Sequence, residues 1–258
     1  MDLELKNKVA IISGSTRGIG KGIALMLAQE GCRVVICGRT KEALDNTAKE
    51  IIAKGGEVLP MLGDVTRSDF ISEIVDLSLN TYGAIDILVN NVGGNRRNNF
   101  EKTSEEDWQT IIDLNLMSHV RMSRKVVPVM KKQESGSIIF ISSIFGREVG
   151  GPTLSIYNTT KSAIISLAKV MASELANEGI RVNSVAPGSI RFPGGSWDKR
   201  YKEDPEKIEK FIRENLPIGR FGTVEEIAGV VCFLASQKAS LVTGTCINVD
   251  GCQSRSLI

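Results

Sequence analysis

Residues 8–20 read Lys8-Val-Ala-Ile-Ile-Ser13-Gly14-Ser-Thr-Arg-Gly-Ile-Gly20, and this stretch decides how the chain folds. Lys8–Ser13 is a short run of apolar and β-branched residues, which is typical of a strand buried on both faces. The glycine-rich segment Gly14–Gly20 ends this run, and apolar residues at helical spacing follow from Ile23 to Ala28. We therefore expect a strand, a tight loop and a helix in direct succession.

A glycine loop in this position is typical of a dinucleotide site, because the backbone N–H groups of the helix N-terminus hold the pyrophosphate. Gly14 would allow the tight turn, Gly18 would let the phosphates approach, and Gly20 would let the helix pack on the strand. The spacing differs by one residue from the usual fingerprint, and a glycine turn without a ligand is the alternative. The flanking strand and helix favour the dinucleotide site.

Strands and helices then alternate along the whole chain, which predicts an α/β fold with a doubly wound parallel sheet and helices on both faces. Capping-box signals at Thr103–Glu106 and Thr223–Glu226 each predict a helix start. The first of these helices is expected to run through Asn115 to about Lys131. Seven strands are expected, at Lys8–Ser13, Arg33–Cys37, Val58–Leu62, Ile85–Asn90, Ser137–Ser142, Arg181–Val185 and Cys246–Val249. The other helices are expected at Lys41–Ala53, Ser68–Tyr82 and Ser155–Asn177.

No linker divides the sequence, so we expect one domain over residues 1–258. The irregular segment 189–215 contains Pro193, Gly194, Gly195 and Pro205, and a long insert of this kind is typical of a substrate loop or lid.

Composition excludes several classes of protein. The 32 basic and 30 acidic residues are nearly balanced and scattered, unlike those of a nucleic-acid binder. No apolar run is long enough for a membrane span, and the N-terminus lacks the layout of a signal peptide. Five cysteines without a CxxC pair favour reduced thiols in a cytoplasmic protein, and a single histidine argues against a His-rich metal site.

Tyr157 and Lys161 lie four residues apart in a helical segment, so they share one helix face. Lowering the pKa of a tyrosine by three units needs roughly 4 kcal/mol. A lysine about 4 Å away in a cleft supplies a free energy of that order. The pair is therefore a candidate general acid/base. The alternative is that Tyr157 caps a core helix while Lys161 extends to water.

The end of the second strand, Cys37-Gly38-Arg39-Thr40, carries no acid for the ribose hydroxyls of NAD(H). Arg39, together with Arg17 of the glycine loop, could instead hold a 2′-phosphate. We therefore expect NADP(H) to be preferred over NAD(H), with two solvated surface arginines as the alternative.

At this point the chain resembles the short-chain dehydrogenase/reductases, and its 3-oxoacyl-carrier-protein-reductase-like members in particular. The resemblance runs from about Lys6 to Cys252 and implies a Rossmann-type fold. The motifs that carry it occur in the family's order: Ser13-Gly14-Ser15-Thr16-Arg17-Gly18-Ile19-Gly20, Asp64-Val65, Asn90-Asn91-Val92-Gly93, Asn115, Ser143, Tyr157 with Lys161, and Pro187-Gly188 followed by Ile190.

The resemblance implies a role for each catalytic residue. Tyr157 would give a proton to a substrate carbonyl as hydride arrives from the nicotinamide, and Ser143 would hydrogen-bond the same oxygen. Lys161 would lower the Tyr157 pKa and bind the nicotinamide ribose, while Asn115 would hold a water. A strand-end hydroxyl and a buried structural amide are the alternatives for Ser143 and Asn115. The implied cofactor-binding residues are Gly14, Ser15, Thr16, Arg17, Gly18, Ile19, Gly20, Arg39, Asp64, Val65, Asn91, Gly93, Tyr157, Lys161, Pro187, Gly188 and Ile190.

Two departures from the family pattern bear on the site. Ser143 precedes Tyr157 by one residue more than is usual, so Ser142 is the fallback serine. Phe192 stands where the family often has a threonine that touches the nicotinamide amide, so we expect that contact either to come from backbone or to be lost.

The substrate side of the site has its own candidates. Arg96 and Arg97 follow the fourth strand and could meet an anion, although an exposed basic loop is as good an explanation. Phe192, Pro193 and Trp197 could form an apolar wall, or the late loop could simply bury its own aromatics.

Family members that act on acyl carrier protein have arginines where this chain has Gln133-Glu134 and Asn177-Glu178. Lys131 and Lys132 remain nearby. Because Glu178 would repel an acidic carrier, we expect a small or CoA-linked carbonyl substrate. His119 is expected to pack in a core or a subunit contact.

The leading prediction is an NADPH-dependent reductase that converts a ketone or β-keto substrate to an alcohol. The alternatives are a sugar, polyol or other secondary-alcohol dehydrogenase and a non-enzymatic NADP(H) sensor. The resemblance also implies a homotetramer, and the apolar Leu257-Ile258 at the C-terminus is consistent with a subunit contact.

Overall fold

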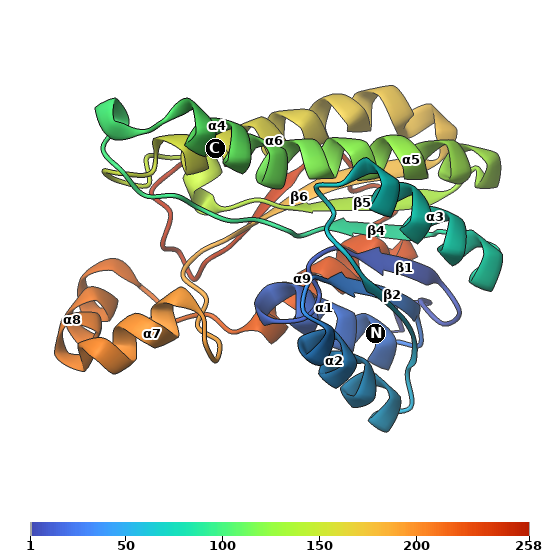
Figure 1. Cartoon of the computed structure of the whole chain (residues 1–258), viewed down its shortest axis with the longest axis horizontal. Coiled ribbons are helices and arrows are strands. Elements are labelled where there is room, and N and C mark those ends of the chain that lie inside the picture. The colour runs from blue at the N-terminus through green and yellow to red at the C-terminus, as the bar shows by residue number, and fades with distance from the viewer. Residues whose placement is uncertain (1, 258) are drawn as a thin grey trace.

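The computed structural model describes residues 2–257 and contains a seven-stranded parallel sheet in the order β3-β2-β1-β4-β5-β6-β7 (Figure 1). The predicted fold class is therefore confirmed. The strands are β1 Val9–Ile12, β2 Arg33–Gly38, β3 Glu57–Leu62, β4 Ile87–Asn90, β5 Gly136–Ile141, β6 Ile180–Pro187 and β7 Cys246–Val249. Each lies within about two residues of its predicted position.

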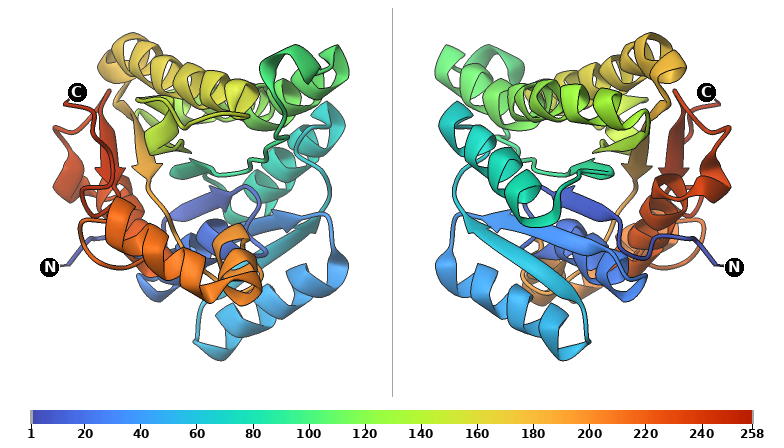
Figure 2. Two further views of the ribbon diagram at one scale, coloured as in Figure 1. Left: turned by 90° about the vertical axis from the view of Figure 1, so that its left-hand side faces the viewer. Right: turned by 90° about the vertical axis from the view of Figure 1, so that its right-hand side faces the viewer.

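Helices cover both faces of the sheet (Figures 1 and 2). Helices α1, α2 and α9 lie on one face, and α3, α5 and α6 lie on the other. Their bounds are α1 Gly18–Gln29, α2 Lys41–Ala53, α3 Ser68–Tyr82, α4 Glu105–Ile112, α5 Ser118–Gln133, α6 Ser155–Leu175, α7 Ser196–Glu203, α8 Pro205–Asn215 and α9 Val224–Ala235. Among residues 2–257, no helix is both long and apolar enough to cross a membrane.

The sheet separates two apolar cores because successive residues of a strand point to opposite faces. Ile12 and Ile36 pack under α1 and α9, whereas Ile11 and Val35 pack under the helices of the other face. All four side chains are fully buried, as expected for parallel strands covered on both sides.

The strand order reverses between β1 and β4, since the chain moves outward through β2 and β3 and then returns to the far side of β1. Loops that leave the carboxyl ends of β1 and β4 therefore run in opposite directions and open a crevice between them. This crevice is where the candidate site lies.

The predicted helix from Thr103 to about Lys131 is corrected in two ways. Its N-cap is Ser104, whose Oγ accepts from Asp107 N at 3.0 Å, whereas the Thr103 hydroxyl donates to the Phe100 carbonyl. The helix is also interrupted by a π turn at Asp113–Met117. The second predicted capping box, at Thr223, is confirmed with both reciprocal hydrogen bonds.

Segment 189–215 contains more regular structure than we expected, because it forms helices α7 and α8 beyond the ends of the strands (Figure 1). The Asp204 side chain accepts from Lys207 N at 3.0 Å, and Pro205 occupies the first helical turn of α8. An aspartate cap followed by proline is a strong helix-start signal, so this helix could have been found in the sequence.

Candidate active site

A cavity of about 780 Å³ opens at the carboxyl edge of the sheet, where the strand order reverses. It brings together segments that lie far apart in the sequence. The predicted site residues that line it are Gly14, Thr16, Arg17, Gly18, Ile19, Gly20, Arg39, Asp64, Val65, Asn91, Gly93, Ser143, Tyr157, Lys161 and Gly188. The predicted site residues that do not line it are Ser15, Asn115, Pro187 and Ile190.

The glycine loop has a backbone that other residues would disturb. Gly14 and Gly18 adopt φ values of +63° and +55°, in the left-handed region that favours glycine. A Cβ atom on Gly20 would overlap the Gly14 carbonyl oxygen. The loop is thus a bare backbone cradle at the N-terminus of α1, which fits a diphosphate.

Two side chains hold this loop in shape. Ser15 is fully buried, and its hydroxyl donates to Ile12 O and accepts from Cys37 N, both at 2.9 Å. Asn91 donates its amide hydrogens to Ser13 O at 2.9 Å and Gly14 O at 3.2 Å. Both residues act on the cradle through its backbone, and Ser15 does not face the cavity.

At the end of β2, a Cβ atom on Gly38 would overlap the Thr16 side chain, so this position has no room for a carboxylate. The Arg39 guanidinium is largely exposed and lies 3.5 Å from an Asp64 carboxylate oxygen. Burial pushes the Asp64 pKa upward, but hydrogen bonds from Thr66 and the Arg39 charge lower it overall. The two residues expected at the adenosine end thus pair with each other.

Ser143 and Tyr157 meet in the centre of the cavity. Ser143 follows β5, its hydroxyl accepts from Phe145 N at 3.2 Å, and it lies near enough to the Tyr157 phenol to lower the pKa of that group. The fallback residue Ser142 donates to the Lys161 carbonyl oxygen at 2.8 Å and is therefore used to hold α6. The extra residue between Ser143 and Tyr157 does not separate the two hydroxyl groups.

Lys161 is buried, with 3% of its surface exposed, and its Nζ donates to Ile141 O at 2.8 Å. No carboxylate within residues 2–257 pairs with it. Burial lowers the pKa of Lys161 to about 8. Its Nζ lies 5.8 Å from the centre of the Tyr157 ring.

The expectation that Lys161 lowers the Tyr157 pKa stays a prediction. Burial raises the pKa of Tyr157, while the Ser143 hydrogen bond and the Arg97 charge oppose that rise. The cost of burying a phenolate opposes the attraction of any nearby cation.

Asn115 lies in the π turn, and π turns are frequent at functional sites. Its Oδ1 accepts from Gly94 N at 2.8 Å, and its Nδ2 donates to Gly94 O at 2.9 Å and to Thr160 Oγ1 at 3.0 Å. Both amide hydrogens are used inside the protein. The side chain therefore ties the loop after β4 to the helix that carries Tyr157 and Lys161.

His119 is a core residue, as expected. Its Nε2 lies 2.9 Å from the Val92 carbonyl oxygen, and its ring packs against Phe140. Burial and the charge of Lys161 lower the His119 pKa to about 3, so the ring is neutral and Nε2 donates the hydrogen bond.

The two arginines after β4 have different surroundings. Arg96 forms an ion pair with Asp107 at 2.7 Å and does not line the cavity. Arg97 lines it, as do Lys199 and Arg200 of α7. Lys199 and Arg200 could not be found from the sequence, because no local pattern in α7 shows which side of this helix faces the cavity.

The aromatic residues of the late segment divide between two environments. Trp197 stacks on Phe211, with ring centres 4.6 Å apart, and packs near Phe221. Phe192 packs on the glycine loop, since a Cβ atom on Gly18 would lie 2.6 Å from its ring. Pro193 is exposed and outside the lining. Trp197 is thus half-buried in the cavity wall, and Phe192 lies over the phosphate cradle.

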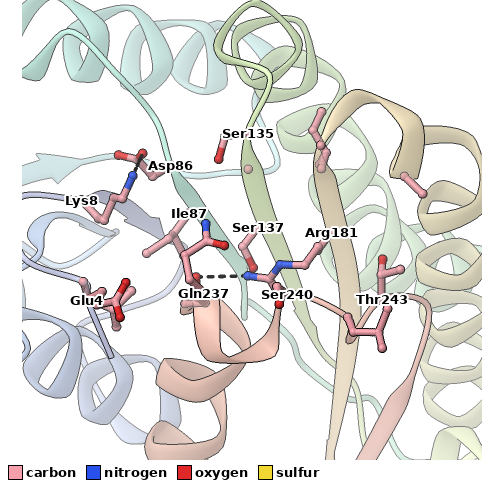
Figure 3. A pocket seen from close by; sticks show the side chains of 17 residues that line it. Glu4, Lys8, Asp86, Ile87, Ser135, Ser137, Arg181, Gln237, Ser240 and Thr243 are labelled. Atoms are coloured by element: carbon pink, nitrogen blue, oxygen red, sulfur yellow. Dashed lines mark hydrogen bonds and ion pairs between the residues drawn. The ribbon is translucent and has the colours of Figure 1, made fainter. Parts of the chain in front are cut away.

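A second cavity, of about 300 Å³, lies at the opposite edge of the sheet (Figure 3). Its charged groups have partners: Lys8 pairs with Asp86 at 3.0 Å, and Arg181 donates to the Leu234 carbonyl at 2.6 Å. Arg181 thereby caps the C-terminus of α9, which favours a cation. These contacts are structural and leave no side chain poised for chemistry.

Comparison with known proteins agrees with this geometry. A family model described as "Enoyl-(Acyl carrier protein) reductase" matches residues 14–252. The chain is 41% identical to the 3-oxoacyl-[acyl-carrier-protein] reductase FabG of Thermotoga maritima, over 96% of this chain and 98% of that protein.

Two solved structures are similar over nearly their whole length. L-sorbose reductase from Gluconobacter frateurii, complexed with NADPH and L-sorbose, has a TM-score of 0.94 and 33% identity, with complete coverage of both chains. A 7α-hydroxysteroid dehydrogenase complexed with NADH and 7-oxo glycochenodeoxycholic acid has a TM-score of 0.91 and 32% identity, covering 100% of this chain and 98% of that one. The chain belongs to the short-chain dehydrogenase/reductase family of oxidoreductases.

Proposed function

We propose that this protein is an NADPH-dependent carbonyl reductase that converts a ketone or β-keto substrate to an alcohol, and that it runs the reverse oxidation when conditions favour it. The observation that carries the proposal is the meeting of the Ser143 and Tyr157 hydroxyls beside buried Lys161, in the cavity that also contains the glycine cradle.

Each residue has a distinct part in the reaction. When bound, the dihydronicotinamide supplies the hydride that reaches the carbonyl carbon. Ser143 holds the carbonyl oxygen by a hydrogen bond that strengthens as negative charge develops there. Tyr157 donates its phenolic proton to the same oxygen, which completes the alcohol. Lys161 keeps a cation close to the resulting phenolate and would bind the nicotinamide ribose. Its pKa of about 8 is close to neutral pH, which suits proton exchange.

NADP(H) is the proposed cofactor because Arg39 and Arg17 line the adenosine end of the cavity and Gly38 leaves no room for an acid. Asp64 contacts Arg39 and would compete with a 2′-phosphate, so the phosphate must attract the guanidinium more strongly than Asp64 does. Arg39→Asp should shift the ratio of kcat/KM values toward NADH. An unchanged ratio would show that Arg39 does not select the cofactor.

The test of the catalytic assignment is Tyr157→Phe, which removes one oxygen atom and keeps the ring. Turnover should be lost while NADPH binding, followed by fluorescence, stays nearly intact. Retained turnover would refute the assignment. Tight NADPH binding with no ketone consumed by the wild-type protein would favour a sensor instead.

A second candidate is a sugar or polyol dehydrogenase, favoured by the close structural likeness to L-sorbose reductase. A role on acyl carrier protein is less favoured, because Lys131 is paired with Glu178 at 2.8 Å and the Glu178 carboxylate would repel an acidic carrier. Measuring kcat/KM for free ketones, sugars and carrier-linked ketoacyl groups distinguishes the three candidate functions.

We also propose a cytoplasmic homotetramer. Val170 on α6 is 52% exposed and Leu257 is fully exposed, so both are available for subunit contacts. Ile258 lies outside the described residues. Sedimentation of the protein tests the assembly.

A further inference from the structure

Positive charge dominates the cavity. Of the carboxylates in the described part of the chain, that of Asp64 alone lines it. The cations that line it are Arg17, Arg39, Arg97, Lys161, Lys199 and Arg200. An excess of this size favours anionic ligands.

These cations serve different ends of the cavity. Arg17 and Arg39 belong to the glycine loop and the end of β2, where the phosphates of a cofactor are expected. Arg97 lies at the other end, close enough to Tyr157 for its charge to lower the pKa of the phenol. Arg200 lines the same cavity as Arg97, and burial, followed by the charge of Arg200, lowers the Arg97 pKa.

Arg97 and Arg200 come from different elements, the loop after β4 and helix α7. The Arg200 guanidinium lies over the Trp197 ring, 5.0 Å from its centre, which fixes its position without neutralising it. Trp197 is in turn held by its stack on Phe211. The two guanidiniums therefore face one volume from two sides.

Neither guanidinium has a carboxylate partner within residues 2–257, although Arg96, which precedes Arg97, and Lys202, two residues after Arg200, each have one. Arg96 pairs with Asp107 at 2.7 Å, and Lys202 pairs with Asp198 at 2.8 Å. Among the described residues, Arg97 and Arg200 thus line the cavity unpaired, as does Lys199, and the two guanidiniums repel each other. A bound anion would remove that repulsion and pair with both.

We propose that Arg97 and Arg200 form a subsite for a carboxylate carried by the substrate, within a few bonds of the carbonyl group that Ser143 and Tyr157 hold. The preferred substrates are then oxo acids rather than neutral ketones. This proposal rests on the proposed function, because it assumes that a carbonyl group is reduced beside Tyr157. Planar guanidiniums suit a carboxylate because each can donate two parallel hydrogen bonds to it.

The experiment compares oxo acids of increasing chain length, from pyruvate to 5-oxohexanoate, with their methyl esters. Each is assayed for kcat/KM with NADPH. We expect the acid to exceed its ester at least about 10-fold for one chain length or more. The acid-to-ester ratio should fall about 10- to 100-fold in Arg97→Gln and in Arg200→Gln, the range for one hydrogen bond to a charged group. Arg97→Lys should retain part of the ratio.

Arg96→Gln is the matched control, since Arg96 is adjacent in sequence but paired with Asp107 outside the cavity. It should leave the ratio unchanged. The subsite would be overturned if ester and acid had equal kcat/KM values at every chain length. It would also be overturned if the acid-to-ester ratio stayed unchanged in both glutamine variants. Either result would leave the reductase assignment standing. Failure of the wild-type protein to reduce any acid, ester or neutral ketone would instead count against the proposed function and the subsite together.

Discussion

Replacing Lys161 with methionine should change how the stability of this protein depends on pH. Lys161 is 97% buried by area, being 3% exposed, and burial lowers its pKa from 10.5 to about 8. That difference corresponds to roughly 3.4 kcal/mol, because one pKa unit is about 1.36 kcal/mol. The folded protein carries this cost in full below about pH 8, where Lys161 is charged in both the folded and the unfolded chain.

The sign follows from proton binding. Between about pH 8 and 10.5 the unfolded chain holds the Lys161 proton and the folded protein does not, so this residue makes the protein more stable as pH rises. Between pH 7 and pH 10, the free energy of unfolding of the wild-type protein should therefore rise by about 2.5 kcal/mol relative to that of Lys161→Met. Comparing the two proteins in this way cancels the other titrating groups and the loss of the hydrogen bond to Ile141, which contribute equally at both pH values.

Urea unfolding of both proteins without cofactor, at pH 7 and pH 10, measures the effect through the transition midpoints. Lys169→Met is the control, because Lys169 is an exposed lysine on the same helix and should give a nearly constant difference. Parallel pH curves for wild type and Lys161→Met would refute the reasoning, since they would mean that Lys161 titrates normally in the folded protein.

Three further substitutions test other parts of the structure. Gly18→Ala forces a side chain into a left-handed backbone and against Phe192, so NADPH binding by titration should weaken at least about 10-fold, from a strain of about 1–2 kcal/mol plus the contact. Thr223→Ala removes the cap of α9, and calorimetry should show Tm lower by about 2–4 °C. Ser143→Ala removes a hydrogen bond that lowers the Tyr157 pKa, so kcat should fall about 100-fold and the alkaline limb of the reductive pH profile should move to higher pH.

Sequence patterns predicted the parts of this protein that local physics determines. A strand buried on both faces must be apolar throughout, and β1, β4 and β5 were found on that basis. The one-residue error at the start of α4 also has a local cause. Thr103 and Ser104 each precede an acid by three residues, so both fit the capping pattern, and only the fold selects Ser104.

Long-range placement could not be read from the sequence. Phe192 replaces a threonine expected near the nicotinamide, and nothing in its neighbours shows that its ring packs on Gly18, far earlier in the chain. The pairing of Arg96 and not Arg97 with Asp107 depends on how the loop after β4 meets α4. The π turn at Asp113–Met117 is composed of residues that an ordinary helix would accept, so no signal marks it.

Buried ionisable side chains without acidic partners indicate where the site lies, with no need for a related protein. Buried cations normally have acidic partners, yet Lys161 has only a backbone carbonyl among the described residues. Burial lowers the pKa of both Lys161 and the neighbouring His119, and the Lys161 charge lowers the His119 pKa further. Burial raises the pKa of the Cys32 and Cys37 thiols, which keeps both groups in their neutral, unreactive form. A fold keeps an unpaired buried charge only where something other than stability requires it, and here that place is the cavity at the reversal of strand order.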